Sequence, residues 1–174
     1  MAPISEAPAI YDPDPQHRTM SSIDQLLTSE TVYCRAALAS RKRVLQHIAE
    51  CLATDNINDD ELFDALMNRE RLGSTGLGEG VAIPHCRTDC TSVRVAFVSL
   101  AEPIDYEASD GQPVDLLFAI VVPNEEQSAH LEALAALAQL FGEPSNRQAL
   151  RACTTDDELH GCITRQLAAQ RSAA

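Results

Sequence analysis

His85, His130 and Arg69 are the residues of this sequence best suited by type and setting to group-transfer chemistry. A histidine with a pKa near neutrality offers an unprotonated ring nitrogen as a nucleophile. His85 follows an apolar segment, 81–83, and Pro84, and a proline tends to end a strand. We therefore expect its imidazole to project from a strand edge and not into a core. Arg69, at the end of a preceding helix, could hold a phosphoryl group by paired N–H bonds.

A glycine-rich segment separates Arg69 from His85. Four of the eight residues from 73 to 80 are glycine, which predicts a loop and not a helix or strand. Such a loop suits a backbone that approaches an anion and offers its N–H groups, and an ordinary turn is the alternative reading. A P-loop is excluded because no lysine follows the glycines. A dinucleotide fingerprint is excluded because Gly76, Gly78 and Gly80 have single spacings and lie between a helix and a strand.

The elements that must position these residues alternate between helix and strand. Capping residues and apolar positions at three-to-four spacing predict helices over 23–27, 41–52, 59–72, 127–141 and from about 155 onward. Apolar runs predict strands over 31–34, 81–83, 93–100 and 114–122. The helix over 127–141 carries His130 near its start and an apolar stripe of Leu131, Leu134, Leu137 and Leu140. The order predicts an α/β fold: one domain with a mixed, mainly covered central β-sheet flanked by helices.

Composition sets the limits of the domain and of its partners. Residues 1–20 are rich in proline without apolar periodicity, so we expect a disordered tail, a domain over 21–169 and a disordered C-terminus over 170–174. A net charge of −13 argues against nucleic acid as a partner. The longest apolar run, 116–122, is far below the ~20 residues of a spanning helix, and the N-terminus lacks a secretory pattern. We expect a cytoplasmic protein without direct membrane insertion, and reduced cysteines.

Cysteines near His85 suggest two other kinds of site. His85, Cys86 and Cys90 are all potential zinc ligands, but a single cluster with an adjacent His-Cys pair suits a tetrahedral ion poorly. Cys86 and Cys90 could also form a redox pair, although their spacing is one residue longer than in the thioredoxin motif. We favour the interpretation of ordinary small residues and expect no metal.

A longer motif resembles a known family. Residues 69–85 read RERLGSTGLGEGVAIPH, and this segment is similar to the IIA domains of the fructose and mannitol phosphotransferase systems, above all to the nitrogen-regulatory members. The similarity continues through 113–118, 121–123 and His130-Leu131, and it covers roughly residues 21 to 167. The resemblance implies a single domain of the mannitol/fructose IIA type.

The resemblance also implies roles for individual residues. His85 matches the phosphorylated histidine, with Nε2 as the acceptor atom, His130 matches a second histidine that steadies the phosphoryl group, and Arg69 matches an arginine that neutralises its charge. The implied phosphate pocket comprises Gly73, Ser74, Thr75, Gly76, Gly78 and Gly80. The family pattern has glycine where Cys86 stands and asparagine where Glu79 stands. We expect Cys86 to narrow access to the site and Glu79 to add negative charge near it.

The partners follow from the same resemblance. It implies an HPr-like phosphocarrier protein as phosphate donor, no cofactor, and a phosphohistidine carrier in place of a multiple-turnover enzyme. Downstream, it implies a regulatory or transport protein, in regulation of the nitrogen and potassium type. Two alternatives stay open: a sugar-specific IIA component that passes phosphate to a IIB domain, and a phosphate-independent interaction module.

Overall fold

A mixed β-sheet of six strands forms the centre of the domain. The computed structural model describes residues 23–173, so the tail expected over 1–20 lies outside the described residues. The strand order is β1-β5-β6-β3-β2, and β4 also pairs with β6. The strands are β1 (Val32–Ala36), β2 (Gly76–Gly78), β3 (Val81–Ala82), β4 (His85–Thr88), β5 (Arg94–Ile104) and β6 (Val114–Pro123). β6 runs antiparallel to β5 and parallel to β3 and β4.

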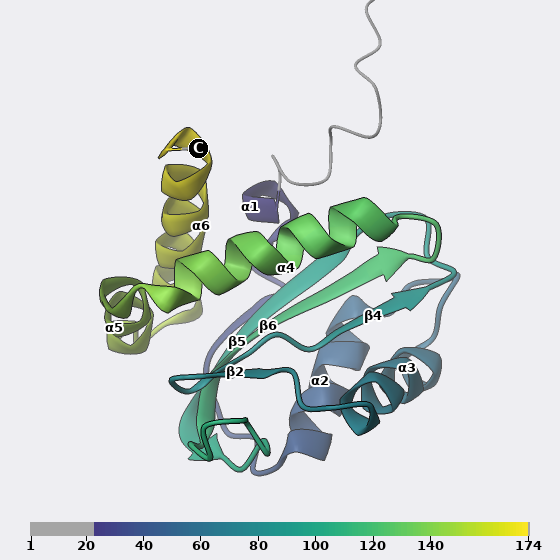
Figure 1. Ribbon diagram of the computed structural model, residues 1–174, viewed down its shortest axis with the longest axis horizontal. Coiled ribbons are helices and arrows are strands. Elements are labelled where there is room, and N and C mark those ends of the chain that lie inside the picture. Colours follow the sequence, from purple (N-terminus) through teal and green to yellow (C-terminus); the bar gives the residue numbers. More distant parts are fainter. Residues whose placement is uncertain (1–22, 174) are drawn as a thin grey trace, which may run out of the picture.

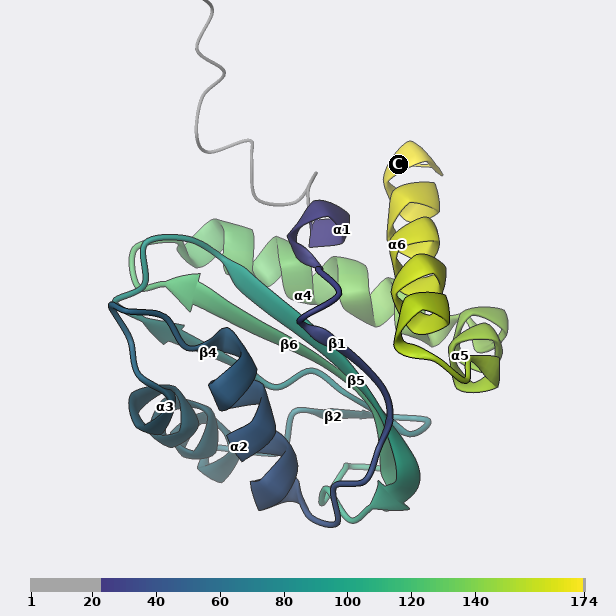
Figure 2. The same cartoon turned by 180° about the vertical axis from the view of Figure 1, so that it is seen from behind.

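Helices cover both faces of this sheet, as the alternation of elements predicts (Figure 1). They are α1 (Ile23–Leu26), α2 (Arg41–Leu52), α3 (Asp59–Arg71), α4 (Gln127–Gly142), α5 (Pro144–Ala152) and α6 (Asp156–Ala173). α2 and α3 pack on one face, and α1, α4, α5 and α6 pack on the other. Figure 2 shows the opposite side of the molecule, on which α2 and α3 lie nearer the viewer than α4. Within residues 23–173, no helix combines the length and the apolar character that a membrane crossing requires.

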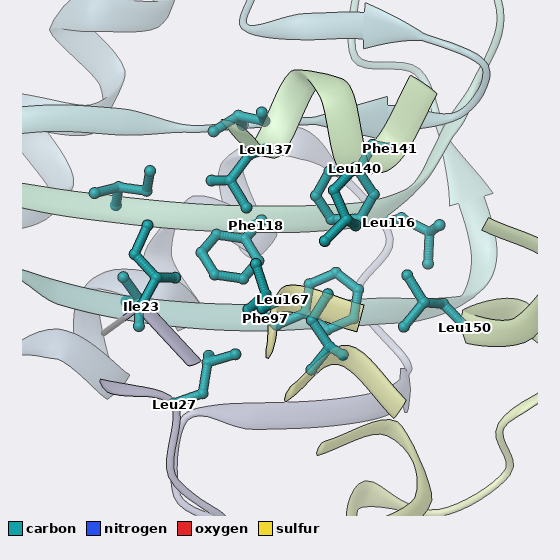
Figure 3. Close-up of a cluster of buried hydrophobic side chains, with 14 of the residues drawn as sticks. Ile23, Leu27, Phe97, Leu116, Phe118, Leu137, Leu140, Phe141, Leu150 and Leu167 are labelled. Carbon is teal, nitrogen blue, oxygen red and sulfur yellow. The ribbon is translucent and has the colours of Figure 1, made fainter. Parts of the chain in front are cut away.

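Two hydrophobic cores result, one on each face of the sheet. Figure 3 shows the α4–α6 side, where Phe97 of β5 and Phe118 of β6 lie with ring centroids 5.8 Å apart. Phe141 of α4 packs on Phe118 at 6.3 Å. Residues of β6 alternate between the two cores, and both sets are buried. The apolar run of 114–122 is thus a strand covered on both faces, as expected.

The helix boundaries agree with the capping signals of the sequence. The side chain of Ser40 accepts a hydrogen bond from the N–H of Arg43 at the start of α2, and Asn58 does the same for Glu61 at the start of α3. These caps satisfy N–H groups that have no partner inside the helix. They fix where α3 begins, and therefore which residues reach its C-terminal end.

The strand predicted over 81–83 ends before Pro84, as expected, but a second strand that was not predicted, β4, begins at His85 directly after the proline. β3 and β4 both run parallel to β6, with Pro84 between them, and the carbonyl of Pro84 accepts a hydrogen bond from the N–H of Ile120. A proline lacks a donor but keeps its acceptor, so it interrupts the strand without breaking the pairing. The expected loop is also partly a hairpin, because β2 pairs with β3.

The C-terminal helices differ from the prediction in three ways. α5 was not predicted; it begins at Pro144, and the buried side chain of Arg147 donates to the last carbonyls of α4. α6 continues to Ala173, because Gln170 donates to a carbonyl of α4, so residues 170–173 are helical. Leu131 is 67% exposed, because alanine and leucine occur on several sides of α4 and leave its buried face ambiguous.

Candidate functional site

His85 is the first residue of β4 and lies beneath the start of α4. It pairs with Ile120, and the next residue, Cys86, pairs with Val121. Neighbouring residues of a strand point to opposite faces. The His85 ring therefore lies on the α4 side, and Cys86 packs into the core on the α2–α3 side. His85 as a whole residue is only 9% exposed, so its imidazole does not project from an open edge as the sequence suggested.

Two hydrogen bonds define the tautomer of His85. Its Nδ1 lies 2.7 Å from the carbonyl oxygen of Ile83, which can only accept, so Nδ1 carries the proton. Its Nε2 accepts from the Nε–H of Arg69 at 3.1 Å, so this nitrogen holds the lone pair. The hydrogen-bond network thus leaves Nε2 as the nucleophilic atom of the ring.

Arg69 reaches His85 from the last turn of α3, which lies alongside β4 (Figure 1). Its Nη1 donates to the carbonyl of Gly73 at 2.8 Å, just past the end of the helix. The guanidinium is thereby oriented by the residue that follows the helix. One planar cation holds both the loop and the nucleophilic nitrogen.

His130, in the first turn of α4, is the second imidazole of the site. Its ring centroid lies 4.9 Å from that of His85, with 59° between the ring planes. Its Nδ1 is buried, and within residues 23–173 it has no hydrogen-bond partner. A buried polar atom without a partner is costly, so this nitrogen has capacity for a bound group.

Burial and nearby positive charge keep both imidazoles neutral. Burial lowers the pKa of His85, the hydrogen bond to Ile83 partly opposes this, and Arg69 adds to the lowering. The pKa of His130 falls to about 4, first through burial and then through the positive charges of protonated His85, of Arg87 and of Arg69. At neutral pH the site therefore holds two uncharged imidazoles and two guanidinium groups.

Arg87 is a site residue that the sequence reading missed. It stands two residues after His85 on β4 and therefore faces the same side of the sheet. Its side chain is exposed, and its charge contributes to the lowered pKa of His130. The i, i+2 spacing would have indicated it, had residues 85–88 been predicted as a strand.

Ser74 and Thr75, which were expected to contact phosphate, instead hold the loop in place. The hydroxyl of Thr75 donates to Glu70, whose carboxylate also accepts from the Thr75 N–H at 3.1 Å and from the Tyr106 hydroxyl at 2.8 Å. Ser74 donates to the carbonyl of Tyr106 at 2.9 Å. Burial and the charge of Glu70 raise the pKa of Tyr106, so it stays protonated as a donor.

The glycines divide into one near the site and three that shape the hairpin. Gly73 contributes the carbonyl that holds Arg69. A Cβ at Gly76 would lie 2.7 Å from the Cβ of Ala108, so close packing requires glycine there. Gly78 and Gly80 have positive φ and shape the turn between β2 and β3.

The turn of the glycine hairpin lies away from the His85 ring. The carbonyl of Gly80 accepts from the N–H groups of Asp115 and Leu116, whereas His85 pairs with Ile120. Five residues of strand correspond to roughly 16 Å, so Gly78 and Gly80 do not line a pocket at His85. Glu79 lies at the same distant turn, 3.5 Å from Arg147, and adds no charge beside the imidazoles.

Cys86 is separated from the chemistry of His85 by the sheet itself. It is 6% exposed, and burial, reinforced by Cys90, raises the pKa of its thiol to about 12. Because the thiolate is the form that ligates metals and reacts, this position favours an inert core residue. Among the described residues, no group of three or more His, Cys, Asp or Glu side chains is arranged to hold a metal ion. Cys86 does not narrow access to the ring, contrary to the expectation.

Comparison with known proteins places this chain and its fold in a family. Residues 25–166 match the family model for the phosphoenolpyruvate-dependent sugar phosphotransferase system, EIIA 2. The chain therefore belongs to this EIIA family, as its sequence motif suggested.

Nitrogen regulatory proteins are among its most similar relatives. The chain is 39% identical over 147 residues to the nitrogen regulatory protein of Pseudomonas aeruginosa, covering 83% of this chain and 96% of that one. The crystal structure of nitrogen regulatory protein IIA-Ntr from Neisseria meningitidis superposes with a TM-score of 0.78 at 34% identity, covering 81% of this chain and 98% of that one. A fructose-specific EIIABC component from Bacillus subtilis is 33% identical over 140 residues, which are 79% of this chain and 22% of that protein.

Proposed function

We propose that this protein is a regulatory phosphoryl carrier that accepts a phosphoryl group on Nε2 of His85 from an HPr-like phosphocarrier protein. The observation that supports this most directly is the pair of hydrogen bonds at the ring. The carbonyl of Ile83 holds the proton on Nδ1, and the lone pair of Nε2 faces a guanidinium. An imidazole held in this tautomer, neutral and beside fixed positive charge, suits attack on phosphorus.

The transfer needs only groups that are present at the site. The N–P bond of the donor breaks as a bond forms between phosphorus and Nε2 of His85. For this bond to form, the Nε–H of Arg69 must first leave the lone pair of Nε2, and it donates instead to an oxygen of the incoming phosphoryl group, which it can do from nearly the same position. Nδ1 keeps its proton, and the carbonyl of Ile83 stabilises the positive charge that the ring gains.

His130 and Arg87 complete the proposed acceptor. His130 is neutral at physiological pH and can donate one ring N–H to a phosphoryl oxygen. Arg87 faces the same side of β4 as His85 and adds a second positive charge. Transfer of a phosphoryl group depends mainly on positioning and on such charges, so no cofactor is required.

The downstream role is proposed from the relatives. The similarity to nitrogen regulatory proteins over most of both chains favours a protein whose phosphorylation state controls regulatory or transport partners. The fructose-specific EIIABC relative supports one alternative, transfer of the phosphoryl group to a IIB domain during sugar uptake. An interaction module that works without phosphate is the other alternative, and it predicts no phosphorylation at all.

The test is phosphorylation in a reconstituted relay. Wild type, His85→Ala and His160→Gln are incubated with phosphoenolpyruvate, enzyme I and an HPr-like carrier, and intact mass is measured. His160 is a matched control, because its ring contacts the carbonyl of Leu27, far from the site. We expect one acid-labile phosphoryl group on wild type and His160→Gln and none on His85→Ala. A folded wild type that no carrier phosphorylates would contradict the proposal.

The phosphorylated protein from this experiment distinguishes the regulatory role from the sugar-uptake role. Phosphorylated protein is mixed with IIB domains, and loss of the phosphoryl mass is followed over time. Rapid transfer to a IIB domain would favour the sugar-uptake alternative. A binding partner that is gained or lost on phosphorylation, without loss of the phosphoryl group, would favour the regulatory role.

A further inference from the structure

A second polar pocket lies at the opposite end of β6 from His85. It has a volume of about 340 Å³ and is bordered by Arg35, Ser99, Asp115 and Arg151, over a floor from β5 and β6. Its size is within the range of small-molecule sites. In a chain with a net charge of −13, a pocket bordered by two arginines is unusual. It shares no residue with the His85 site.

Arg35 adopts a strained backbone at the edge of this pocket. Its φ is +52°, a left-handed conformation that a non-glycine residue rarely adopts. The pairing of β1 with β5 is irregular at this point, between Tyr33 and Ala36. The N–H of Arg35 donates to the hydroxyl oxygen of Ser99 at 2.9 Å. Backbone strain of this kind is concentrated at functional sites, which makes the position a candidate for one.

The side chain of Arg35 has unused hydrogen-bonding capacity. Its Nε donates to the carbonyl of Cys153 at 3.2 Å, and within residues 23–173 its two terminal nitrogens have no hydrogen-bond partner. Its charge also contributes to the lowered pKa of Glu158, but that carboxylate is held by Thr154 and does not line the pocket. The planar end of the guanidinium is therefore open to a ligand.

Ser99 supplies a second donor beside Arg35. It is only 6% exposed, and its oxygen accepts from the N–H of Arg35. No acceptor for its own hydroxyl proton is found in the described part of the chain, so this O–H is available inside the pocket. The terminal N–H groups of Arg35 and the O–H of Ser99 line the same pocket, and donors of these two kinds can bind an oxyanion together.

The charge of the lining residues selects the kind of oxyanion. Arg151 is held by Asp115 through hydrogen bonds of 2.8 to 3.2 Å, so these two charges offset each other. One positive charge, that of Arg35, remains unmatched among the residues that line the pocket. A carboxylate carries one negative charge and balances that of Arg35, whereas a phosphate monoester carries nearly two and leaves an excess negative charge in the pocket. We propose that this pocket binds a small organic carboxylate, with its carboxyl group on Arg35 and Ser99.

The test uses benzoate as probe and benzamide as its uncharged analogue, followed by NMR of the backbone amides at pH 7. Arg35→Asn removes the guanidinium, and asparagine tolerates a positive φ. Arg43→Gln removes the same charge from an exposed position of α2 and serves as the matched control. We expect saturable shifts at Arg35 and its β5 neighbours with benzoate. Wild type should bind benzamide at least about tenfold more weakly than benzoate, and Arg35→Asn should bind benzoate at least about tenfold more weakly than wild type does. The affinity of Arg43→Gln for benzoate should equal that of wild type.

Three results would overturn the proposal. The first is the absence of saturable shifts with benzoate, and the second is equal affinity for benzoate and benzamide. The third is tighter binding of inorganic phosphate than of benzoate, which would reject the carboxylate assignment. If Arg35→Asn does not fold, the affinities of wild type for benzoate and benzamide still decide whether the pocket selects a carboxylate. Phosphorylation of His85 is not required for any of these measurements, so failure here is independent of the proposed carrier function.

Discussion

Two buried polar clusters lie near the C-terminal end of α3, and they differ in how completely their hydrogen bonds are satisfied. Glu70 is 5% exposed, and its carboxylate accepts hydrogen bonds from Thr75 and Tyr106. In the neighbouring cluster, Nδ1 of His130 has no partner in the described part of the chain, and Nε2 of His85 is engaged only by the side chain of Arg69. A closed network supports the structure, and an incomplete one leaves atoms that can react or bind.

This contrast indicates different roles for Arg69 and Glu70, which are adjacent residues of α3. Arg69 faces the imidazoles, and Glu70 faces the loop and Tyr106. Substitution of the first should change the rate of transfer and leave the fold intact. Substitution of the second should change stability and leave the chemistry intact.

The largest effect is expected from Arg69→Gln. Loss of one fixed donor to a developing oxyanion typically costs about 10²–10³-fold in rate, and we expect a decrease of this order in phosphoryl acceptance. The initial rate is measured by quenched reaction and intact mass. Arg71→Gln is the control, because Arg71 lies on the same helix turn and its side chain donates to Asn68 instead of His85. An equal loss of rate in both variants would show that general charge, and not the Arg69 contact, is responsible.

A decrease in stability is expected from Glu70→Ala. The change leaves the Tyr106 hydroxyl and the Thr75 groups buried without their acceptor, at a cost of about 3 kcal/mol in the free energy of unfolding. Urea denaturation measures it, with the exposed residue Glu102 changed to alanine as the control. The folded variant should still accept one phosphoryl group. Wild-type stability in Glu70→Ala would refute the supporting role.

The smallest effect is expected in how folding stability and ring protonation of His85 and His130 depend on pH. The pKa of His85 is lowered, and that of His130 falls to about 4, against about 6.5 in the unfolded chain. As pH falls, the unfolded state therefore binds protons before the folded state does. The stability that these two histidines contribute is fully present above about pH 6.5, and it is lost as the pH falls toward their pKa values in the folded state. NMR titration of the ring C–H signals should give midpoints below 6.5, and Arg69→Gln should raise that of His85. Midpoints at or above 6.5 would contradict this electrostatic description.

The sequence predicted the long elements better than the short ones. Residues 114–122 and the capped helices α2 and α3 have strong patterns, and the structure confirms them. β2, β4 and α5 are short or contain proline at a boundary, and each depends on contacts with a distant element for its stability. Local patterns do not contain that information.

For the site as well, some residues could be predicted from the sequence and others could not. The motif indicated His85, Arg69 and His130, and the structure brings these three together. The positions of Ser74 and Thr75 could not be predicted, because their partner Tyr106 lies about thirty residues away and has no motif of its own. For the same reason the sequence did not distinguish phosphate ligands from loop supports.

The hydrogen bond from Nδ1 of His85 to the carbonyl of Ile83 has a consequence for how long a partner must stay. The bond spans only two residues, across a rigid proline, so the orientation of the ring is established during folding. A docking protein need not restrict the acceptor further, which removes part of the ordering cost of a productive collision. Under the proposed carrier function, transfer would then succeed within a brief, low-affinity encounter, and the protein would be free to exchange one partner for the next.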